Sequence, residues 1–316
     1  MSEQYKYVIL GAGQLGLAIM DELVGQGETA KLVNRSGKVN EVLPEGVVLE
    51  TADLNDPAQV AAVCEGAEIV FFCAQPPYDK WPELFPALAA SVIEGVALSG
   101  AKLVFGSNVY MYGPNNGRPI HEDLPYAAQT RKGKARAEVA KMLLDAHAQG
   151  RLQVVIGRAA DFYGPRVTDS LVGEMLFGAA LSGDTGMLVG NIDLPHTLTY
   201  IGDFARELVT LSRHDEAFGR AWHVPSAETI TPRRFKEIIE AEIGRPVKVR
   251  VVGKTMMRLA GLFNPIARET AEIMYEFDEP FIIDHSRYVA AFGNGVTLHE
   301  EAVRETVAWY RLHHQA

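Results

Sequence analysis

The stretch "YKYVILGAGQLGLAIMDELVGQG", residues 5–27, indicates the fold class of this 316-residue chain. A short apolar run ends in glycines, and the residues after them are apolar at helical spacing until further glycines end the pattern. This order of strand, glycine turn and helix is typical of a sheet whose neighbouring strands are joined through helices.

The same alternation continues to about residue 164. We expect further strands within residues 29–36, 47–54, 67–75, 101–108 and 152–164, and further helices within residues 57–66, 84–100 and 130–150. Strands that alternate with helices pair in parallel through right-handed crossovers, which places helices on both faces of the sheet. The sequence therefore predicts an α/β protein with a Rossmann-type doubly wound parallel sheet.

The segment GAGQLG places Gly11, Gly13 and Gly16 in G-x-G-x-x-G spacing, between a strand and a helix. The first glycine permits a tight turn, the second lets a pyrophosphate approach the backbone, and the third lets helix and strand pack closely. The N–H groups at the helix start can bind phosphate, so this loop, with Gln14 and Leu15, is predicted to bind a dinucleotide. The alternative is a glycine turn in a Rossmann-like fold that has lost its cofactor.

The residues after the second strand favour NADP over NAD. An NAD-binding domain usually has Asp or Glu here for the ribose 2′-hydroxyl, whereas this chain has Asn34, Arg35 and Ser36, with Lys38 close behind. Arg35 can bind a 2′-phosphate through two N–H groups, whereas an acidic residue would repel it. In the alternative, Arg35 is a solvated loop residue and Asn34 binds the ribose of NAD.

Two further strand ends contribute to the predicted cofactor site. Asp53 and Leu54 follow the third strand, where a carboxylate and an apolar side chain would frame the adenine. Ala74 and Gln75 follow the fourth strand and would line the cofactor channel. The alternative for all four positions is an ordinary turn residue, since the carboxyl ends of strands carry these too.

The alternation of strands and helices weakens from about Gly164. We expect a dinucleotide-binding Rossmann domain over residues 1–164. Residues 165–316 are expected to form mainly a smaller C-terminal substrate-binding lobe, with segments that return to the Rossmann body. A last helix is predicted over residues 299–314.

The composition argues against several other classes of protein. The net charge is −10 and the sequence pI is about 5.4, so no basic face for nucleic acid is expected. No apolar run approaches the ~18 residues of a membrane span, and residues 1–10 show no signal-peptide pattern, which predicts a cytoplasmic protein without a membrane partner. Cys64 and Cys73 lie in apolar sequence outside any Cys/His cluster, which predicts two buried thiols and no metal site.

An ordered set of motifs extends over nearly the whole chain: GAGQLG, ADL at 52–54, VYMYG at 109–113, KARAE at 134–138, RAADFYGP at 158–165, TYIGDFAR at 199–206, IIDHSR at 282–287 and ETVAWY at 305–310. This set resembles the extended short-chain dehydrogenase/reductase superfamily, of the NAD-dependent epimerase/dehydratase type. The segment at 263–287 is similar to an atypical group within it. The resemblance implies a Rossmann fold, a nicotinamide dinucleotide, a small-molecule substrate and, by family analogy, a homodimer.

The catalytic pattern of this superfamily is a Ser near the end of the fifth strand and Tyr-x-x-x-Lys on the next helix. The resemblance places Lys134 at the lysine, where it would hold the nicotinamide ribose, with Glu138 four residues later. Thr130 stands where the Tyr is expected, and Asn108 where the Ser is expected. A threonine hydroxyl is too weak an acid to replace a phenol, while Asn108 can still donate a hydrogen bond to a substrate oxygen.

Three tyrosines are candidates for the missing acid. Tyr110 lies two residues beyond Asn108 and can share its side of an extended chain, which makes it the preferred substitute. Tyr112 matches the family's tyrosine before glycine, usually a wall of the site, and Tyr126 lies just before the predicted helix. Each of the three can instead be a packed or wall aromatic residue.

Residues farther along the chain are expected to shape a substrate pocket. Asp161 and Tyr163 leave the sixth strand at its carboxyl end, where ligands bind in such sheets. The resemblance implies that His196 stands where sugar-nucleotide enzymes often carry Arg. Because a neutral imidazole is a poor diphosphate anchor, a nucleotide-sugar substrate is less favoured. Tyr275 and Glu276 either close this pocket or end a packed helix.

The sequence leaves three functions open. The first is an NADP-dependent oxidoreductase for a small or medium carbonyl or alcohol, with Asn108 and Tyr110 at the substrate oxygen. The second is an NAD(P)-dependent epimerase or dehydratase with transient hydride transfer. The third is a non-catalytic redox sensor that binds the dinucleotide. The missing Tyr and Ser favour the sensor, while Lys134 and the complete lobe favour an enzyme.

Overall fold

The computed structural model describes residues 4–263 and 265–313, which fold into two compact units. Unit 1 contains the described residues up to Met111, then Arg131–Arg158 and Phe204–Val224. Unit 2 contains Tyr112–Thr130, Ala159–Asp203 and the described chain from Pro225 onward. The chain therefore passes between the units several times, and the boundary expected after residue 164 stays a prediction.

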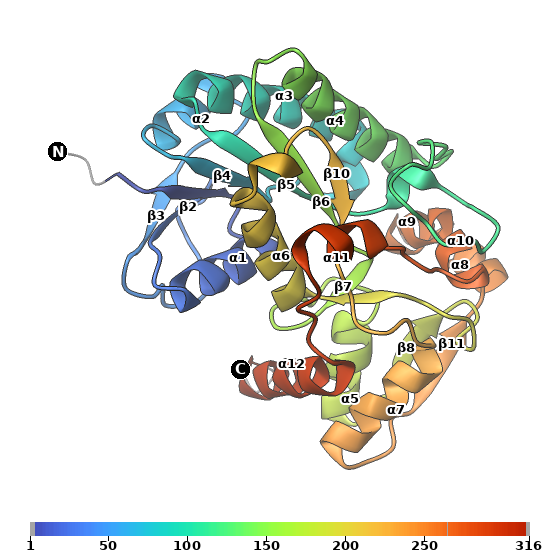
Figure 1. Ribbon diagram of the computed structural model, residues 1–316. Helices are drawn as coiled ribbons and strands as arrows, with labels where there is room; N and C mark the ends of the chain where they lie inside the picture. Colours follow the sequence, from blue (N-terminus) through green and yellow to red (C-terminus); the bar gives the residue numbers. More distant parts are fainter. Residues whose placement is uncertain (1–3, 264, 314–316) are drawn as a thin grey trace. The chain divides into compact units, whose positions relative to one another are not determined.

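Unit 1 is built on a parallel sheet of seven strands in the order β10-β6-β5-β4-β1-β2-β3 (Figure 1). The strands are β1 (Tyr7–Leu10), β2 (Ala30–Asn34), β3 (Val47–Thr51), β4 (Ile69–Phe72), β5 (Lys102–Ser107), β6 (Val154–Arg158) and β10 (Ala221–His223). This confirms the predicted Rossmann-type doubly wound fold. The edge strand β10 was not among the expected strands, because three residues give too short a pattern to recognise.

Helices cover both faces of this sheet (Figure 1). They are α1 (Gln14–Gly25), α2 (Pro57–Val63), α3 (Trp81–Ser99), α4 (Arg131–Ala148) and α6 (Ile201–Ser212), with short 3-10 turns η1 (Tyr78–Lys80), η2 (Tyr110–Tyr112) and η4 (Asp215–Ala217). The start of α2 is fixed locally, because the Asp56 carboxylate accepts a hydrogen bond from the Ala58 N–H and Pro57 occupies the first turn.

Two glycines let helices approach the centre of the sheet. Gly106 of β5 and Gly157 of β6 are paired neighbours. A Cβ at Gly106 would lie 2.5 Å from Leu15 of α1, and one at Gly157 would lie 2.4 Å from Leu208 of α6. Because Gly106 and Gly157 have no side chains, Leu15 of α1 and Leu208 of α6 can pack directly on the sheet.

One helical stretch in unit 1, Tyr78–Ser99, is long and apolar enough to cross a membrane by length and composition alone. No uninterrupted apolar run of that length is visible in the sequence. The helix packs against α2 and α4, and Phe85, Val92 and Val96 are fully buried. Core helices of globular proteins pass the same test of length and composition, so it is weak evidence for a membrane span.

Unit 2 contains two small parallel sheets and a set of helices. The strand pairs are β7 (Asp161–Tyr163) with β9 (Leu198–Tyr200), and β8 (Gly186–Val189) with β11 (Val249–Val252). The helices are η3 (Gly173–Gly178, a π-helix), α5 (Ala179–Ser182), α7 (Pro232–Ile243), α8 (Lys254–Ala260), α9 (Pro265–Glu272), α10 (Tyr275–Asp278), α11 (Ser286–Phe292) and α12 (His299–His313). The predicted last helix is present as α12, and position 314 lies outside the described residues.

The strand expected over residues 152–164 is divided between the units. β6 ends at Arg158, and β7 starts at Asp161 in a different sheet. The Ala160 N–H between them donates to the Thr199 hydroxyl at 3.1 Å. The single apolar run in the sequence therefore forms two strands. At the break, the Ala160 N–H bonds to a side-chain hydroxyl and not to a neighbouring strand.

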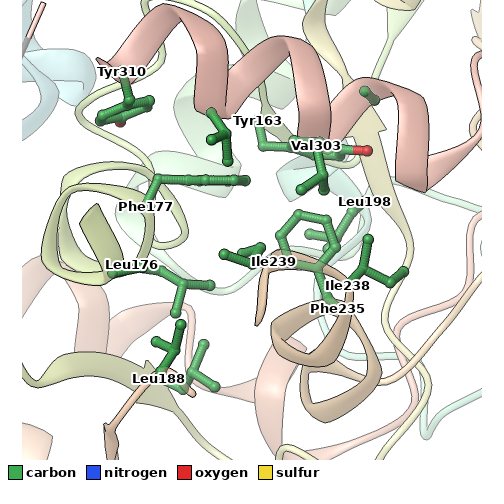
Figure 2. Close-up of a cluster of buried hydrophobic side chains, with 14 of the residues drawn as sticks. Tyr163, Leu176, Phe177, Leu188, Leu198, Phe235, Ile238, Ile239, Val303 and Tyr310 are labelled. Carbon is green, nitrogen blue, oxygen red and sulfur yellow. The ribbon is translucent and has the colours of Figure 1, made fainter. Parts of the chain in front are cut away.

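The core of unit 2 is an aromatic and aliphatic cluster (Figure 2). Phe177, Phe235 and Tyr163 pack together, with ring centroids 4.8 to 6.3 Å apart. Val303 and Tyr310 contribute from α12. Burial of these large side chains is the main stabilising contribution in this unit.

Candidate functional site

The glycine loop after β1 has the backbone geometry that its motif predicts. Gly11 has φ +113°, and a Cβ there would lie 2.5 Å from the Ala74 backbone nitrogen. A Cβ at Gly16 would lie 1.9 Å from the Gly11 carbonyl oxygen. A Cβ at Gly13, by contrast, would meet no described atom within 4 Å. Two glycines therefore close the turn, and the third faces open space that a phosphate can enter.

The start of α1 is a suitable phosphate site. Gly13 is the N-cap residue and provides no side-chain cap, and Gln14 is the first helical residue. Free N–H groups and the helix dipole both favour an anion at such an end. Leu15 is buried against the sheet instead, so only its backbone is available for a ligand.

The loop after β2 presents a cation and a hydroxyl. The Asn34 amide closes this loop by donating to the Lys38 carbonyl at 2.8 Å and accepting from the Gly37 N–H at 2.7 Å. Arg35 and Ser36 are exposed. Asn34 therefore shapes the loop, while Arg35 and Ser36 remain exposed on its surface.

The third strand end lies near this loop. Asp53 accepts hydrogen bonds from the Asn55 backbone and side chain at 3.0 and 2.9 Å. The backbone hydrogen bond from Asn55 is the main cause of a lowered Asp53 pKa, and the charge of Arg35 adds to it. Leu54 is buried. The carboxylate of Asp53 and the guanidinium of Arg35 are thus close enough to interact electrostatically.

A pair of phenols lies at the carboxyl end of β5. Asn108 follows this strand, and its side-chain oxygen accepts a hydrogen bond from the Tyr110 N–H at 3.3 Å. The Tyr110 and Tyr78 hydroxyl groups are 3.5 Å apart and hydrogen-bonded. The preferred substitute acid, Tyr110, is thus held beside Asn108 and touches a second phenol that the sequence did not indicate.

Helix α4 presents its charges on two opposite sides. Lys132 and Arg136, four residues apart, are buried, whereas Lys134 and Glu138 are exposed. The buried side of α4 also carries Val139, so the charged pair lies on the side that faces the core. Lys134, which the resemblance assigned to the nicotinamide ribose, is on the other side. Its role stays a prediction.

Arg136 is buried in an aromatic cage. Its guanidinium carbon lies 4.1 Å from the Trp81 ring centre and 4.8 Å from that of Phe85. One terminal nitrogen donates to the Gln75 side-chain oxygen at 3.0 Å. Burial lowers the pKa of Arg136 to about 9, and interaction with Tyr110 and then Tyr78 opposes this change. The group is therefore charged at neutral pH and interacts with both phenols.

The sequence contained a signal for this cluster that the motif search missed. Lys132 and Arg136 fall on the helical stripe that continues through Val139 and Leu143. Two cations on an apolar stripe at i, i+4 spacing indicate charges directed into a core. The Tyr-x-x-x-Lys pattern drew attention to Lys134 instead, because pattern matching does not consider which side of the helix is apolar.

A second polar cluster lies in unit 2. The Asp161 carboxylate is 2.9 Å from Nε2 of His196, and the imidazole stacks on Phe277 and Phe281 with ring centroids 4.9 and 4.7 Å away. Two residues expected to share a substrate pocket, Asp161 and His196, are thus in direct contact. The carboxylate holds the imidazole ring in one orientation.

Glu276 adds an unusual carboxyl group to this cluster. Its side chain is buried, and one oxygen has no hydrogen-bond partner within the described chain. Burial, followed by the charge of Asp161, raises the Glu276 pKa well above its usual value. Glu276 therefore favours its neutral form, and a carboxyl group with a raised pKa is frequent at acid–base and ligand sites.

Two of the predicted pocket residues are packed aromatics in unit 2. Tyr163 is 1% exposed, lies in the core cluster (Figure 2) and its hydroxyl contacts Nδ1 of His299 at 3.0 Å. Contrary to expectation, it is a core residue and lines no surface. Tyr112 is buried edge-on against Tyr126, with centroids 5.9 Å apart. Thr130 directly precedes α4.

A surface depression of about 520 Å³ lies at the opposite edge of the sheet in unit 1. Lys102, His147, Arg151 and Gln153 contribute to its lining, at the amino ends of β5 and β6. Ligands of such sheets bind at the carboxyl ends, so this depression is not the candidate site.

Among residues 4–263 and 265–313, no group of three or more His, Cys, Asp or Glu side chains could hold a metal ion. Cys64 is buried, whereas Cys73 is half-buried, and neither forms a disulfide.

The parallel sheet, the glycine loop and the helix start after β1 place the chain in the class of Rossmann-fold proteins. The family model of the NAD dependent epimerase/dehydratase family matches residues 7–224, which is more than half of the chain. The protein therefore belongs to this family. A comparison with curated proteins gave no match.

Solved structures share the fold over nearly the whole chain. A double mutant of DesIV, the dTDP-glucose 4,6-dehydratase of Streptomyces venezuelae, with NAD bound, is 16% identical with a TM-score of 0.78, over 96% of each chain. UDP-glucuronic acid 4-epimerase of Bacillus cereus, in complex with NAD, is 14% identical with a TM-score of 0.79, over 98% of this chain and 99% of the other. A UDP-N-acetylglucosamine 4-epimerase of Methanobrevibacter ruminantium is 19% identical with a TM-score of 0.78, over 98% and 99%. At these identities the likeness shows the fold alone.

Proposed function

We propose that this chain is an NADP-dependent oxidoreductase for a small or medium carbonyl or alcohol. The observation that carries the proposal is the Tyr110 phenol after β5, hydrogen-bonded to Tyr78 and interacting with the buried charge of Arg136. A bound nicotinamide supplies or accepts the hydride. The chain must then bind the cofactor, orient the substrate and move a proton. Tyr110 supports the proton-transfer role and Asn108 the polarising role.

The residues that would hold the cofactor fit a phosphorylated dinucleotide. The open space at Gly13 and the start of α1 suit a pyrophosphate. Exposed Arg35 and Ser36 suit a 2′-phosphate, and Asn34 stands where NAD-binding domains usually carry an acidic residue. The NAD in the similar solved structures supports a nicotinamide dinucleotide in general, and Arg35 is the reason for preferring NADP.

The cofactor preference is tested by calorimetric titration with NADPH and NADH. We expect at least tenfold tighter binding of NADPH to the wild type, because a charge-assisted pair with phosphate contributes about 1.5–3 kcal/mol. Arg35→Ala should lose most of this difference and leave NADH binding unchanged. Lys80→Ala, an exposed cation after β4, is the matched control. Equal or tighter binding of NADH by the wild type would contradict the preference.

The reaction is tested by following NADPH oxidation with a panel of aldehydes and ketones. Tyr110→Phe should lower kcat by roughly 10²–10⁴-fold, the usual contribution of general acid catalysis. Thr130→Ala, at the position where the superfamily has its tyrosine, should leave turnover nearly unchanged. Turnover that survives in Tyr110→Phe would remove Tyr110 from the reaction. Tight NADPH binding without turnover of any substrate would support the redox-sensor alternative.

Family membership favours a second candidate, an NAD(P)-dependent epimerase or dehydratase. Such an enzyme returns the hydride to the substrate, so the cofactor is not consumed. The two candidates differ in stoichiometry. An oxidoreductase converts one cofactor per product, whereas an epimerase or dehydratase forms product, seen by NMR, with no net change in cofactor absorbance.

A further inference from the structure

Arg136 raises a problem of charge balance in unit 1. The guanidinium is 2% exposed and lies among the rings of Trp81, Phe85 and Phe105. Its Nε and one terminal nitrogen have no hydrogen-bond partner, and no carboxylate pairs with it, in the part of the chain that the structure describes. A buried charge without a counter-charge costs several kcal/mol, and contact with aromatic faces offsets only part of this cost.

Two phenols near Arg136 can supply a negative charge. Tyr110 and Tyr78 both interact electrostatically with Arg136, and their hydroxyl groups are hydrogen-bonded at 3.5 Å. A second cation reinforces the effect, since the Lys132 ammonium lies 3.9 Å from the centre of the Tyr78 ring. In a hydrogen-bonded pair, the phenol that keeps its proton stabilises the phenolate of its partner.

Charged groups lie near this pair on several elements. Asp79, beside Tyr78 in η1, is half-exposed and lies 4.0 Å from Lys80. From α4 the charged groups are Lys132 and Arg136, and from β4 the neighbour is the neutral Gln75 amide. The α3 and β5 side chains are the aromatic rings already described. Glu83 of α3 is half-exposed and pairs with Arg131. The buried charged groups in contact with this aromatic cluster are thus the two cations of α4.

We propose that Tyr78, Tyr110 and Arg136 form a proton-transfer site. When Tyr110 gives up its proton, the two phenols share the negative charge and Arg136 neutralises it. Tyr110 is the catalytic residue, Tyr78 stabilises its phenolate, and Arg136 is a positioning residue. The arrangement rests on contacts with one indole: Arg136 lies over the Trp81 ring, and the Tyr78 and Tyr110 rings pack on the same Trp81, with centroids 5.0 and 6.4 Å away. The substrate, a compound with a carbonyl or alcohol oxygen, rests on the proposed function.

The proton balance of this site is simple. In carbonyl reduction the O–H bond of Tyr110 would break and a new O–H bond would form on the substrate oxygen, and the carbon would receive the hydride that a bound NADPH supplies. The phenolate left behind is stabilised by Arg136 and by the Tyr78 hydroxyl, and it regains a proton from solvent. Alcohol oxidation runs the same steps in reverse, with NADP⁺ as hydride acceptor.

The site is tested by a spectrophotometric pH titration of tyrosinate on the whole protein, without cofactor or substrate. We expect the wild type to show one early ionisation, at least about one pH unit below the ordinary tyrosine pKa near 10. It should be absent in Tyr110→Phe, shift upward in Tyr78→Phe, and shift upward by at least about one unit in Arg136→Met. Arg131→Met, an exposed cation on the same helix, should leave it unchanged.

Circular dichroism shows whether Arg136→Met folds. If it does not, Arg136→Lys is the second variant: it keeps the positive charge and should keep the early ionisation. No early ionisation in the wild type, or one that Tyr110→Phe or Arg136→Met leaves in place, would overturn the proposal. The result is separable from the proposed function. If an Arg136-dependent ionisation is seen without any turnover, the proton-transfer site is supported and the oxidoreductase function is contradicted. If turnover requires Tyr110 but no such ionisation is seen, the oxidoreductase function is supported and the proton-transfer site is contradicted.

Discussion

At the residue scale, Arg136 and Glu276 are buried ionisable side chains with polar atoms that lack hydrogen-bond partners among the described residues. Arg136 in unit 1 has unpartnered nitrogens and Glu276 in unit 2 has an unpartnered oxygen, counted over the residues that the structure describes. The physical responses differ. A guanidinium stays charged and needs a counter-charge nearby, whereas a carboxyl group can take up a proton and become neutral. Each residue therefore predicts a distinct pH dependence.

We expect the free energy of unfolding of Glu276→Gln to exceed that of the wild type by a margin that grows as the pH rises. The pKa of Glu276 is raised by folding, so between its ordinary and its raised value the folded state binds more protons than the unfolded state. The free energy of unfolding of the wild type then falls with rising pH, by up to about 1.4 kcal/mol per unit from this group. Glutamine mimics the neutral acid and removes this contribution.

Urea unfolding of both proteins from pH 5 to 8 measures the effect of Glu276. The variant should become increasingly more stable than the wild type over this range. Glu237→Gln, an exposed position on α7, is the control and should follow the wild type. Parallel curves for Glu276→Gln and wild type would show that Glu276 is not protonated in the folded state.

At the element scale, the turn from β1 into α1 separates packing from ligand binding. Gly16 is required by packing, because a Cβ there would strike the Gly11 carbonyl. Gly13 has no such constraint, since its φ of −86° suits any residue and open space surrounds it. One motif thus contains a glycine for the fold and a glycine for the ligand.

Substituting these two glycines should have opposite effects. Gly16→Ala should lower the free energy of unfolding by about 1–3 kcal/mol or more, the usual cost of overpacking. Gly13→Ala should unfold nearly like the wild type and yet bind NADPH more weakly, because its methyl group occupies the path of the pyrophosphate. Thermal unfolding without nucleotide and calorimetric titration measure the two effects. Unchanged NADPH affinity in Gly13→Ala would place the pyrophosphate elsewhere.

At the scale of the whole molecule, the sheet of unit 1 draws strands from distant parts of the chain. β1 to β6 follow the alternation visible in the sequence, and β10 joins β6 only after the chain has passed through unit 2. The short β10 could not be predicted, because its pairing with Ile156–Arg158 is a contact between segments more than sixty residues apart. The order of the strands in the sheet therefore differs from their order along the chain.

The sequence by itself determined the Rossmann-type sheet and the glycine loop, since these depend on periodicity and on backbone conformations that few residues adopt. It also indicated Asn108 and Tyr110. Only the tertiary structure placed Tyr163 in a core, turned Lys134 outward and brought Tyr78, Tyr110 and Arg136 together. Their meeting depends on the packing of η1, η2 and α4, and side chains from three elements share no local pattern that a sequence could display.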